Sequence, residues 1–151
     1  MSIFSALNVS ASGMSAQRLR MDTISQNIAN VSTTRDGNGE AYRRKTVVFA
    51  EKESNQFGSY LNQATSVRKN SELNGSGVKV TGIVEDHVTP MREVYDPSHP
   101  DADENGYVTY PNVNTVTEMT NLIDATRSFE ANVTAFNATK SMLLKGLEVG
   151  K

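Results

Sequence analysis

The C-terminal part of the chain, residues 112–149, carries an apolar heptad repeat that no proline interrupts. With Met119 at heptad position a, every d position is apolar: Leu122, Phe129, Phe136 and Leu143. The a positions are more mixed: Met119, Thr126, Val133, Lys140 and Leu147. This spacing predicts one long helix with a coiled-coil interface, which we call the C-terminal seam. At about 1.5 Å per residue the helix is on the order of 50 Å long, more than a small domain needs for its own core.

Apolar residues at position e make this seam wider than one partner helix requires. They are Val116, Ile123 and Leu144. More than one partner can therefore lie along the helix. We expect the assembly interface to include residues from this helix and from the N-terminal part of the chain: Leu7, Met14, Met21, Ile28, Met119, Leu122, Ile123, Phe129, Val133, Phe136, Leu143 and Leu147.

Residues 2–31 carry a second repeat, with apolar side chains at strict seven-residue spacing: Leu7, Met14, Met21 and Ile28. The pattern predicts another helix, but its many serines and asparagines have low helix propensity, and Gly13 costs about 1 kcal/mol relative to alanine. Such a helix is marginal alone and forms when another helix covers its apolar row. The C-terminal helix is the nearest candidate. An isolated hairpin of the two would leave Ile123 and Leu144 uncovered, which favours packing between molecules.

The sequence pattern in the middle of the chain predicts short strands and turns. Turn residues fill 31–40, strand-like segments lie at 41–50, 77–87, 89–95 and 106–110, and 51–74 reads as a polar loop. We predict an α+β fold in which long N- and C-terminal helices pair as a coiled coil, with a small antiparallel β region inserted between them. Residues 1–34 and 112–151 would form a helical domain, and residues 35–111 a central β-rich domain with loops.

Composition argues against several classes of function. A net charge of −2 gives no electrostatic reason to bind nucleic acid or an anionic membrane. The chain has no cysteine, so it has neither a disulfide framework nor a thiolate zinc site. No window approaches 20 apolar residues, so we expect no direct membrane insertion. The N-terminus has no basic segment followed by a continuous apolar run, so we expect no cleaved signal peptide.

Residues with catalytic or metal-binding potential lack the partners that their chemistry requires. His87 and His99 have no serine, cysteine or second histidine at useful spacing. Residues 101–106 match the first six positions of an EF-hand loop, but Asn112 stands at the twelfth position, where calcium needs a bidentate glutamate. A solvated acidic turn is the better interpretation.

Two further segments favour structural interpretations. The basic triplet formed by Arg43, Arg44 and Lys45 lies on a predicted strand, where alternation divides it between two faces. A solvated strand face explains it better than a phosphate site. The glycines at 75 and 77 lack the lysine of a phosphate-binding loop. We therefore predict no enzyme, no cofactor and no metal site.

Both ends of the chain resemble the signatures of flagellar rod and axial proteins. Near the N-terminus, the run Asn27, Ile28, Ala29 and Asn30 leads through threonines and glycines to the aromatic Tyr42. The long gap before Tyr42 is typical of the proximal-rod class. Near the C-terminus, the matching motif includes Glu118, Met119, Glu130, Ala131 and Asn132. In the middle, Asp96-Pro97, His99-Pro100 and Gly106-Tyr107-Val108 extend the resemblance.

This resemblance implies a structural subunit of the bacterial flagellar basal-body proximal rod, which assembles into a helical tube that crosses the periplasm and transmits torque. It implies partners: other copies of the chain, the rod proteins FlgB, FlgF and FlgG, the rod-base protein FliE and the flagellar type III export apparatus. Terminal helices that are weak alone suit this role, because they can travel unfolded and become ordered when neighbours cover their seams.

Two alternatives remain at this point. One is a soluble coiled-coil adaptor that binds a single partner through its seam. The other is a calcium-dependent module built on residues 101–105. An adaptor would have helices that are stable in isolation, whereas a rod subunit would have both ends largely unfolded as a monomer.

Overall fold

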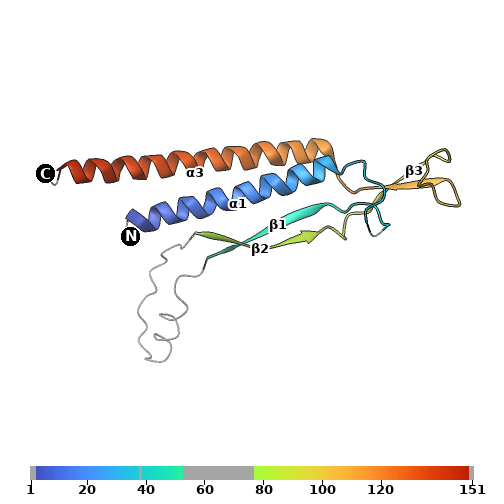
Figure 1. Ribbon diagram of the computed structural model, residues 1–151, viewed down its shortest axis with the longest axis horizontal. Coiled ribbons are helices and arrows are strands. Elements are labelled where there is room, and N and C mark those ends of the chain that lie inside the picture. Colours follow the sequence, from blue (N-terminus) through green and yellow to red (C-terminus); the bar gives the residue numbers. More distant parts are fainter. Residues whose placement is uncertain (1–2, 38, 53–76, 150–151) are drawn as a thin grey trace, which may run out of the picture. The chain divides into compact units, whose positions relative to one another are not determined.

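The computed structural model describes residues 3–37, 39–52 and 77–149. The elements in chain order are α1 (Ile3–Ala29), β1 (Lys45–Glu51), β2 (Val78–Glu85), β3 (Arg92–Tyr95), β4 (Tyr107–Tyr110) and α3 (Thr115–Val149) (Figure 1). Long helices at both ends, with short antiparallel strand pairs between them, confirm the predicted α+β class. None of the described helices is long and apolar enough to cross a membrane.

The strands form two separate pairs, β1 with β2 and β3 with β4. Strands β3 and β4 are antiparallel, with Arg92 opposite Tyr110 and Tyr95 opposite Tyr107. The sequence predicted one small sheet, but the segment between β2 and β3 forms a turn and contains Pro90, which cannot donate to a strand ladder. Most of the predicted loop at 51–74 lies outside the described residues.

Strand β1 begins at Lys45, whereas the sequence predicted a strand that starts at residue 41. The backbone before Lys45 forms hydrogen bonds outside the β1–β2 pair. The Tyr42 N–H donates to the carbonyl of Thr33 at 3.2 Å. The Arg44 N–H donates to the side-chain oxygen of Asn112 at 2.8 Å. These residues are therefore ordered without being part of the β1–β2 ladder.

Asparagines cap both long helices. At the start of α3, Oδ1 of Asn114 accepts hydrogen bonds from the N–H groups of Val116 (3.0 Å) and Thr117 (3.2 Å). This N-cap explains why the helix begins at Thr115 and not at residue 112. At the end of α1, Nδ2 of Asn30 donates to the carbonyl of Gln26 at 2.9 Å, which satisfies one of the carbonyls that a helix end leaves unpaired.

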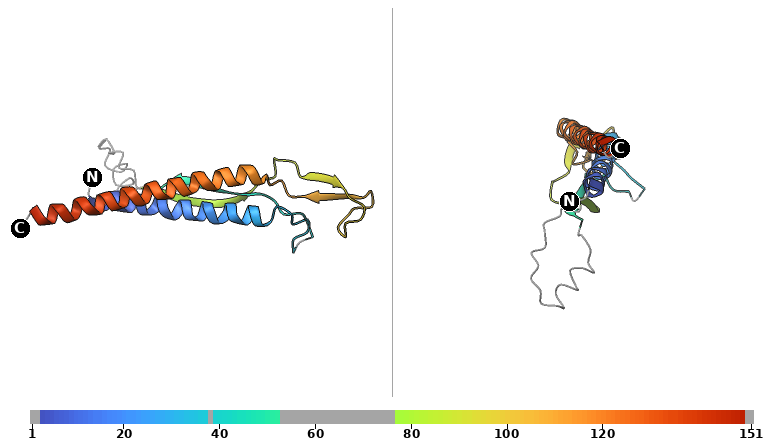
Figure 2. Two further views of the ribbon diagram at one scale, coloured as in Figure 1. Left: turned by 90° about the horizontal axis from the view of Figure 1, so that it is seen from above. Right: turned by 90° about the vertical axis from the view of Figure 1, so that its left-hand side faces the viewer.

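The chain divides into two compact units. The first unit contains Met1–Gln17, Phe49–Thr81 and Ser128–Lys151, and the second contains Arg18–Val48 and Gly82–Arg127. Each unit includes a segment of α1 and a segment of α3, and within each unit these segments lie side by side (Figure 2). The two units differ in how their helices are held.

In the first unit the helices are in contact but few side chains are fully buried. Ser10 and Ala16 are its buried residues among those described. Its segment of α3 contributes half-buried side chains, namely Phe129, Asn132, Val133, Phe136 and Leu143. This part of the structure therefore has a weak core.

Gly13 allows α1 and α3 to approach closely in the first unit. A Cβ atom at Gly13 would lie 2.7 Å from Oδ1 and 3.0 Å from Cγ of Asn132. The Asn132 amide is held in place because its Nδ2 donates to the carbonyl of Ser128 at 2.8 Å. The sequence alone indicates that Gly13 lowers the stability of the helix. In the structure its missing side chain makes room for Asn132.

The substitution Gly13→Ala is expected to destabilise the protein by about 1 kcal/mol, because the clash outweighs the gain in helix propensity. Gly146→Ala is the matched control, since Gly146 lies in α3 with nothing within 4 Å of its Cβ position. That change should stabilise the helix by up to about 1 kcal/mol. Thermal unfolding followed by circular dichroism compares the two variants. Equal stabilisation by both would show that Gly13 is not a contact point.

The second unit has a small apolar core with buried polar side chains beside it. Its buried apolar residues among those described are Ile24, Val47, Val108, Pro111 and Ala125. Thr23, Asn27 and Glu118 are buried as well, with 3, 0 and 1% of their surfaces exposed. The Thr23 hydroxyl donates to the carbonyl of Leu19. Asn27 and Glu118 have hydrogen-bond partners in other elements, and these contacts form the candidate site.

Candidate assembly interface

Asn27, in the last turns of α1, has hydrogen-bond partners for both its oxygen and its nitrogen. Its Oδ1 accepts from the Lys45 N–H and from the Tyr42 hydroxyl, both at 2.9 Å. Its Nδ2 donates to the Lys45 carbonyl at 2.8 Å and to Oε2 of Glu118 at 2.9 Å. The side-chain amide thus pairs with the backbone of Lys45 as a neighbouring strand would. Full satisfaction of its bonding capacity explains how an asparagine tolerates complete burial.

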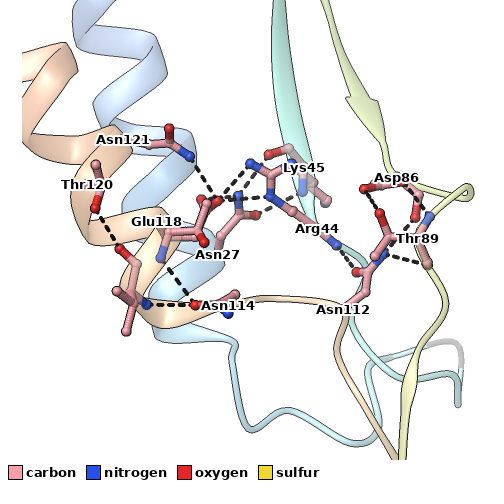
Figure 3. Close-up of polar contacts among 12 residues, drawn as sticks. Asn27, Arg44, Lys45, Asp86, Thr89, Asn112, Asn114, Glu118, Thr120 and Asn121 are labelled. Carbon is pink, nitrogen blue, oxygen red and sulfur yellow. Dashed lines mark hydrogen bonds and ion pairs between the residues drawn. The ribbon is translucent and has the colours of Figure 1, made fainter.

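Glu118, in the first turn of α3, is a buried carboxylate paired with Arg44. Its Oε1 accepts from Nε of Arg44 at 2.9 Å and lies 2.8 Å from Nη2. The other oxygen, Oε2, faces Asn27 (Figure 3). A carboxylate near a helix N-terminus is also favoured by the helix dipole. These contacts offset the cost of taking the carboxylate out of water.

Asn112, just before α3, fixes the adjacent part of the second unit. It accepts from the Arg44 N–H, and its Nδ2 donates to the carbonyls of Asp86 (2.9 Å) and Thr89 (3.1 Å) (Figure 3). We call Asn27, Arg44, Lys45, Asn112 and Glu118 the polar cluster. It joins the end of α1, the start of β1 and the start of α3.

The phenol of Tyr42 lies at the edge of the polar cluster. Burial raises its pKa above the ordinary value of 10.0, and the negative charges of Glu85 and Glu118 raise it further. The neutral phenol, which can donate a proton, is therefore the form present when Tyr42 bonds to Asn27.

Asp86 organises the turn that Asn112 holds. Its Oδ1 accepts from the N–H groups of Val88 (2.9 Å) and Thr89 (3.0 Å), and its Oδ2 accepts from the Thr89 hydroxyl at 2.7 Å. These bonds, led by the one from the Thr89 backbone, lower the pKa of the Asp86 carboxyl below 3.8.

Acid is expected to loosen this turn with a midpoint below pH 3.8. The folded-state pKa is lowered, so the stabilisation is present above pH 3.8 and is lost as the pH falls through the lower folded value. The amide shifts of Val88 and Thr89, followed by NMR during an acid titration, report the loss. In Asp86→Asn, whose side chain does not titrate, the step should disappear. A midpoint at or above pH 3.8 would contradict this assignment.

The side chains predicted to form the C-terminal seam are covered unequally. Those at the d positions, Leu122, Phe129, Phe136 and Leu143, are half-buried. At the a positions Val133 is half-buried, but Met119 is 54% and Leu147 is 69% exposed. At the e position Ile123 is 52% exposed. On α1, the predicted row of Leu7, Met14, Met21 and Ile28 is half-buried.

Two sequence families match the ends of the chain. The family described as "Flagella basal body rod protein" matches residues 7–35, and "Flagellar basal body rod FlgEFG protein C-terminal" matches residues 104–149. Flagellar basal-body rod protein FlgC of Bacillus subtilis is 52% identical, with 100% of both chains covered. The FlgC proteins of Borreliella burgdorferi and Salmonella typhimurium are 42 and 36% identical, with at least 98% of each chain covered.

The chain belongs to the FlgC family of flagellar basal-body rod proteins. It is therefore a structural rod subunit of the flagellar basal body and not an enzyme. This identification decides against the soluble adaptor as the main function. Membership of the FlgC family also means that the chain assembles with other rod components.

The motif residues that pointed to the rod family occupy different environments in this FlgC-family chain. Asn27 and Glu118 are in the polar cluster. Asn30 caps the C-terminal end of α1, and Asn132 lies against Gly13. The other motif residues are the half-buried Ile28 and the exposed Ala29, Met119, Glu130 and Ala131. The sequence did not indicate that Asn27 and Glu118, 91 positions apart, touch.

The residues considered as catalytic or metal-binding candidates make other contacts in the structure. His87 is exposed, with Nε2 3.8 Å from Oε2 of Glu85. His99 contributes Nδ1 as an acceptor for the Asp101 N–H at 3.1 Å. Asp101 accepts from the Thr34 hydroxyl at 2.7 Å and lies 3.5 Å from Arg35. Among the described residues no group of acidic or histidine side chains could hold a metal ion.

A cleft of about 440 Å³ lies in the second unit and includes Asp101 in its lining. Its charged residues are Arg35, Arg43, Glu40, Asp101 and Asp103. Two arginines oppose three carboxylates, so the lining favours neither anions nor cations strongly. The cleft therefore does not indicate a cofactor.

Proposed function

We propose that this FlgC-family chain is a subunit of the proximal rod and assembles through its two terminal helices. Its partners would be other copies of itself, the rod proteins FlgB, FlgF and FlgG, and the rod-base protein FliE. The main support is that Met119, Ile123 and Leu147 on α3 are between 52 and 69% exposed in the single chain. Covering such side chains by a neighbour contributes roughly 25 cal/mol per Å² of apolar surface.

The terminal segments, residues 1–34 and 112–151, would form the helical core of the rod, and residues 35–111 a central domain. Contacts between different faces of successive subunits need not close into a ring, so they generate a helical tube. A tube held by many such contacts is suited to transmit torque. This arrangement needs no cofactor, nucleic acid or membrane anchor.

Export by the flagellar type III apparatus, without a cleaved signal peptide, completes the proposal. The first unit supports it, because its described part of α3 has no fully buried side chain. A helix held so weakly unfolds at small cost, which suits passage through an export channel. Neighbouring subunits would then supply the missing burial.

Limited trypsin digestion of the purified monomer tests this coupling of folding to assembly. We expect cleavage after Lys140 and Lys145, in the weakly held part of α3, well before cleavage after Arg44, which the polar cluster holds. In isolated basal bodies the same lysine sites should be protected. Equal protection of both regions in a verified monomer would contradict assembly-coupled folding and would favour a stable adaptor-like helix.

A further inference from the structure

The N-terminal part of α1 and the start of β2 meet at Ser12 and Gly77. The Ser12 hydroxyl accepts a hydrogen bond from the Val78 N–H at 3.1 Å and donates one to the carbonyl of Val9 at 2.7 Å. We call this contact the Ser12–Gly77 junction. All of its residues belong to the first unit.

Gly77 lets the backbone at the start of β2 approach α1 closely. Its φ of 96° lies in the left-handed region, which residues with a side chain rarely adopt. A Cβ atom at this position would overlap Oγ of Ser12 and lie 3.4 Å from Cα of Val9. The junction therefore requires glycine at position 77 for two reasons, the backbone conformation and the lack of space beside α1.

The junction also joins β2 to the end of β1. The Lys52 N–H, just after β1, donates to the carbonyl of Gly77 at 2.9 Å. Gly77 thus bonds to the end of β1, while the next residue, Val78, bonds to Ser12 of α1. Both strands are therefore fastened to one turn of the helix.

Neither the helix nor the strands of the first unit are stable alone. Residues 3–17 of α1 contain four serines and one glycine, which have low helix propensity, and no charged residue that could form an ion pair along the helix. A pair of strands without a third is marginal in water. Among the described residues of this unit only Ser10 and Ala16 are buried, so its core supplies little stability.

We propose that the Ser12–Gly77 junction makes residues 3–17 of α1 and the first-unit ends of β1 and β2 become ordered in one cooperative step. This inference rests on the proposed function, in which the chain orders as it joins the rod. Each element gives the other contacts that it lacks, so loss of the junction loosens both. A helix and strands that form only together also leave an incompletely assembled chain unfolded, which suits export.

Loosening of α1 by a change in β2 is the first test. The chain has no cysteine, so Ala6→Cys, at a half-buried position of α1, reports local opening by its rate of maleimide labelling in purified basal bodies. Gly77→Ala should raise this rate about tenfold, because the added Cβ breaks the junction. Gly82→Ala, in the same strand with nothing within 4 Å of its Cβ position, is the matched control and should leave the rate unchanged.

Loosening of the strands by a change in α1 is the second test. Ala50→Cys, at a half-buried position of β1, is the reporter. Ser12→Ala removes the acceptor of the Val78 N–H and should raise the labelling rate severalfold. Ser15→Ala is the matched control, since the Ser15 hydroxyl donates to a carbonyl of α1 itself. Ser12→Ala introduces no clash, so this test stands even if Gly77→Ala prevents incorporation into rods.

The proposal requires that each change acts on the other element. Equal labelling of Ala6→Cys in Gly77→Ala and Gly82→Ala would overturn it, and so would equal labelling of Ala50→Cys in Ser12→Ala and its control. If the two reporter chains, without a second substitution, were absent from basal bodies, the proposed function would fail. Reporters that are incorporated but do not respond would overturn the junction alone.

Discussion

Glu118→Ala is expected to lower the free energy of unfolding by about 3 kcal/mol. The change removes a carboxylate that is 1% exposed, takes away the acceptor of the Arg44 guanidinium and leaves the Asn27 amide with one of its two acceptors, the Lys45 carbonyl. Breaking a buried ion pair from one side typically costs about 3 to 5 kcal/mol. The lower end applies here because the Arg44 side chain is 27% exposed and water can partly replace the lost partner. Urea denaturation followed by circular dichroism measures the change.

Glu130→Ala is the matched control for this prediction, because Glu130 lies on the same helix and is exposed. It should shift the free energy of unfolding by less than about 0.5 kcal/mol. A double-mutant cycle with Asn27→Ala adds a test of geometry, since Asn27 and Glu118 share a 2.9 Å hydrogen bond. Their effects should be clearly non-additive. Additive effects, or a loss below about 1 kcal/mol for Glu118→Ala, would mean that the polar cluster does not hold the second unit together.

The sequence predicted the helices and strands well because their signals are local. The heptad of Leu122, Phe129, Phe136 and Leu143 needs no knowledge of the partner to indicate a helix and its apolar face. The caps were also visible in principle, since Asn114 precedes the helix as N-caps commonly do. The predicted strands are present but divided between two pairs, because strand pairing depends on the turn chemistry of Asp86 and Asn112.

The polar cluster could not be predicted from local pattern. Burial of Glu118 depends on Arg44, 74 positions away, and hydrophobic periodicity assigns a glutamate to the surface. In the heptad numbering, Glu118 and Ala125 stand at position g, yet both are buried, while Met119 and Thr126 at position a are exposed. A seam drawn from apolar residues alone therefore includes the half-buried d positions but misses the buried g positions of the face that α3 turns toward its own chain. The exposed a positions remain available for the assembly interface that we propose.

Gly13 shows the same limit on a smaller scale. Helix propensity shows that a glycine at position 13 destabilises the helix. It does not show that the side chain of Asn132, in the other helix, leaves no room for a larger residue there. The family motif was the one sequence signal that marked Asn27, Glu118 and Asn132 together. It did so without indicating which residues they contact.

The double substitution Phe129→Ala with Phe136→Ala is expected to abolish incorporation of the chain into rods. Both side chains are half-buried in the single chain, so part of each ring remains for a neighbour to cover. Truncating a buried phenylalanine costs about 3 to 5 kcal/mol, and full burial is reached in our proposal when subunits assemble. The loss in an isolated monomer should therefore be smaller than the loss in a rod, where it recurs at every copy.

Motility and the protein composition of purified basal bodies measure this effect. The control is Glu148→Ala, an exposed residue near the end of α3, which should shift stability by less than about 0.5 kcal/mol and leave swimming unchanged. Expression and export of the double variant should remain close to normal, because export requires an unfolded chain and not a covered seam. Loss of rods with normal export then points to assembly itself. If cells with the double variant build rods and swim like the control, the d positions of α3 are not part of the assembly interface, and neighbours must contact the subunit through other faces.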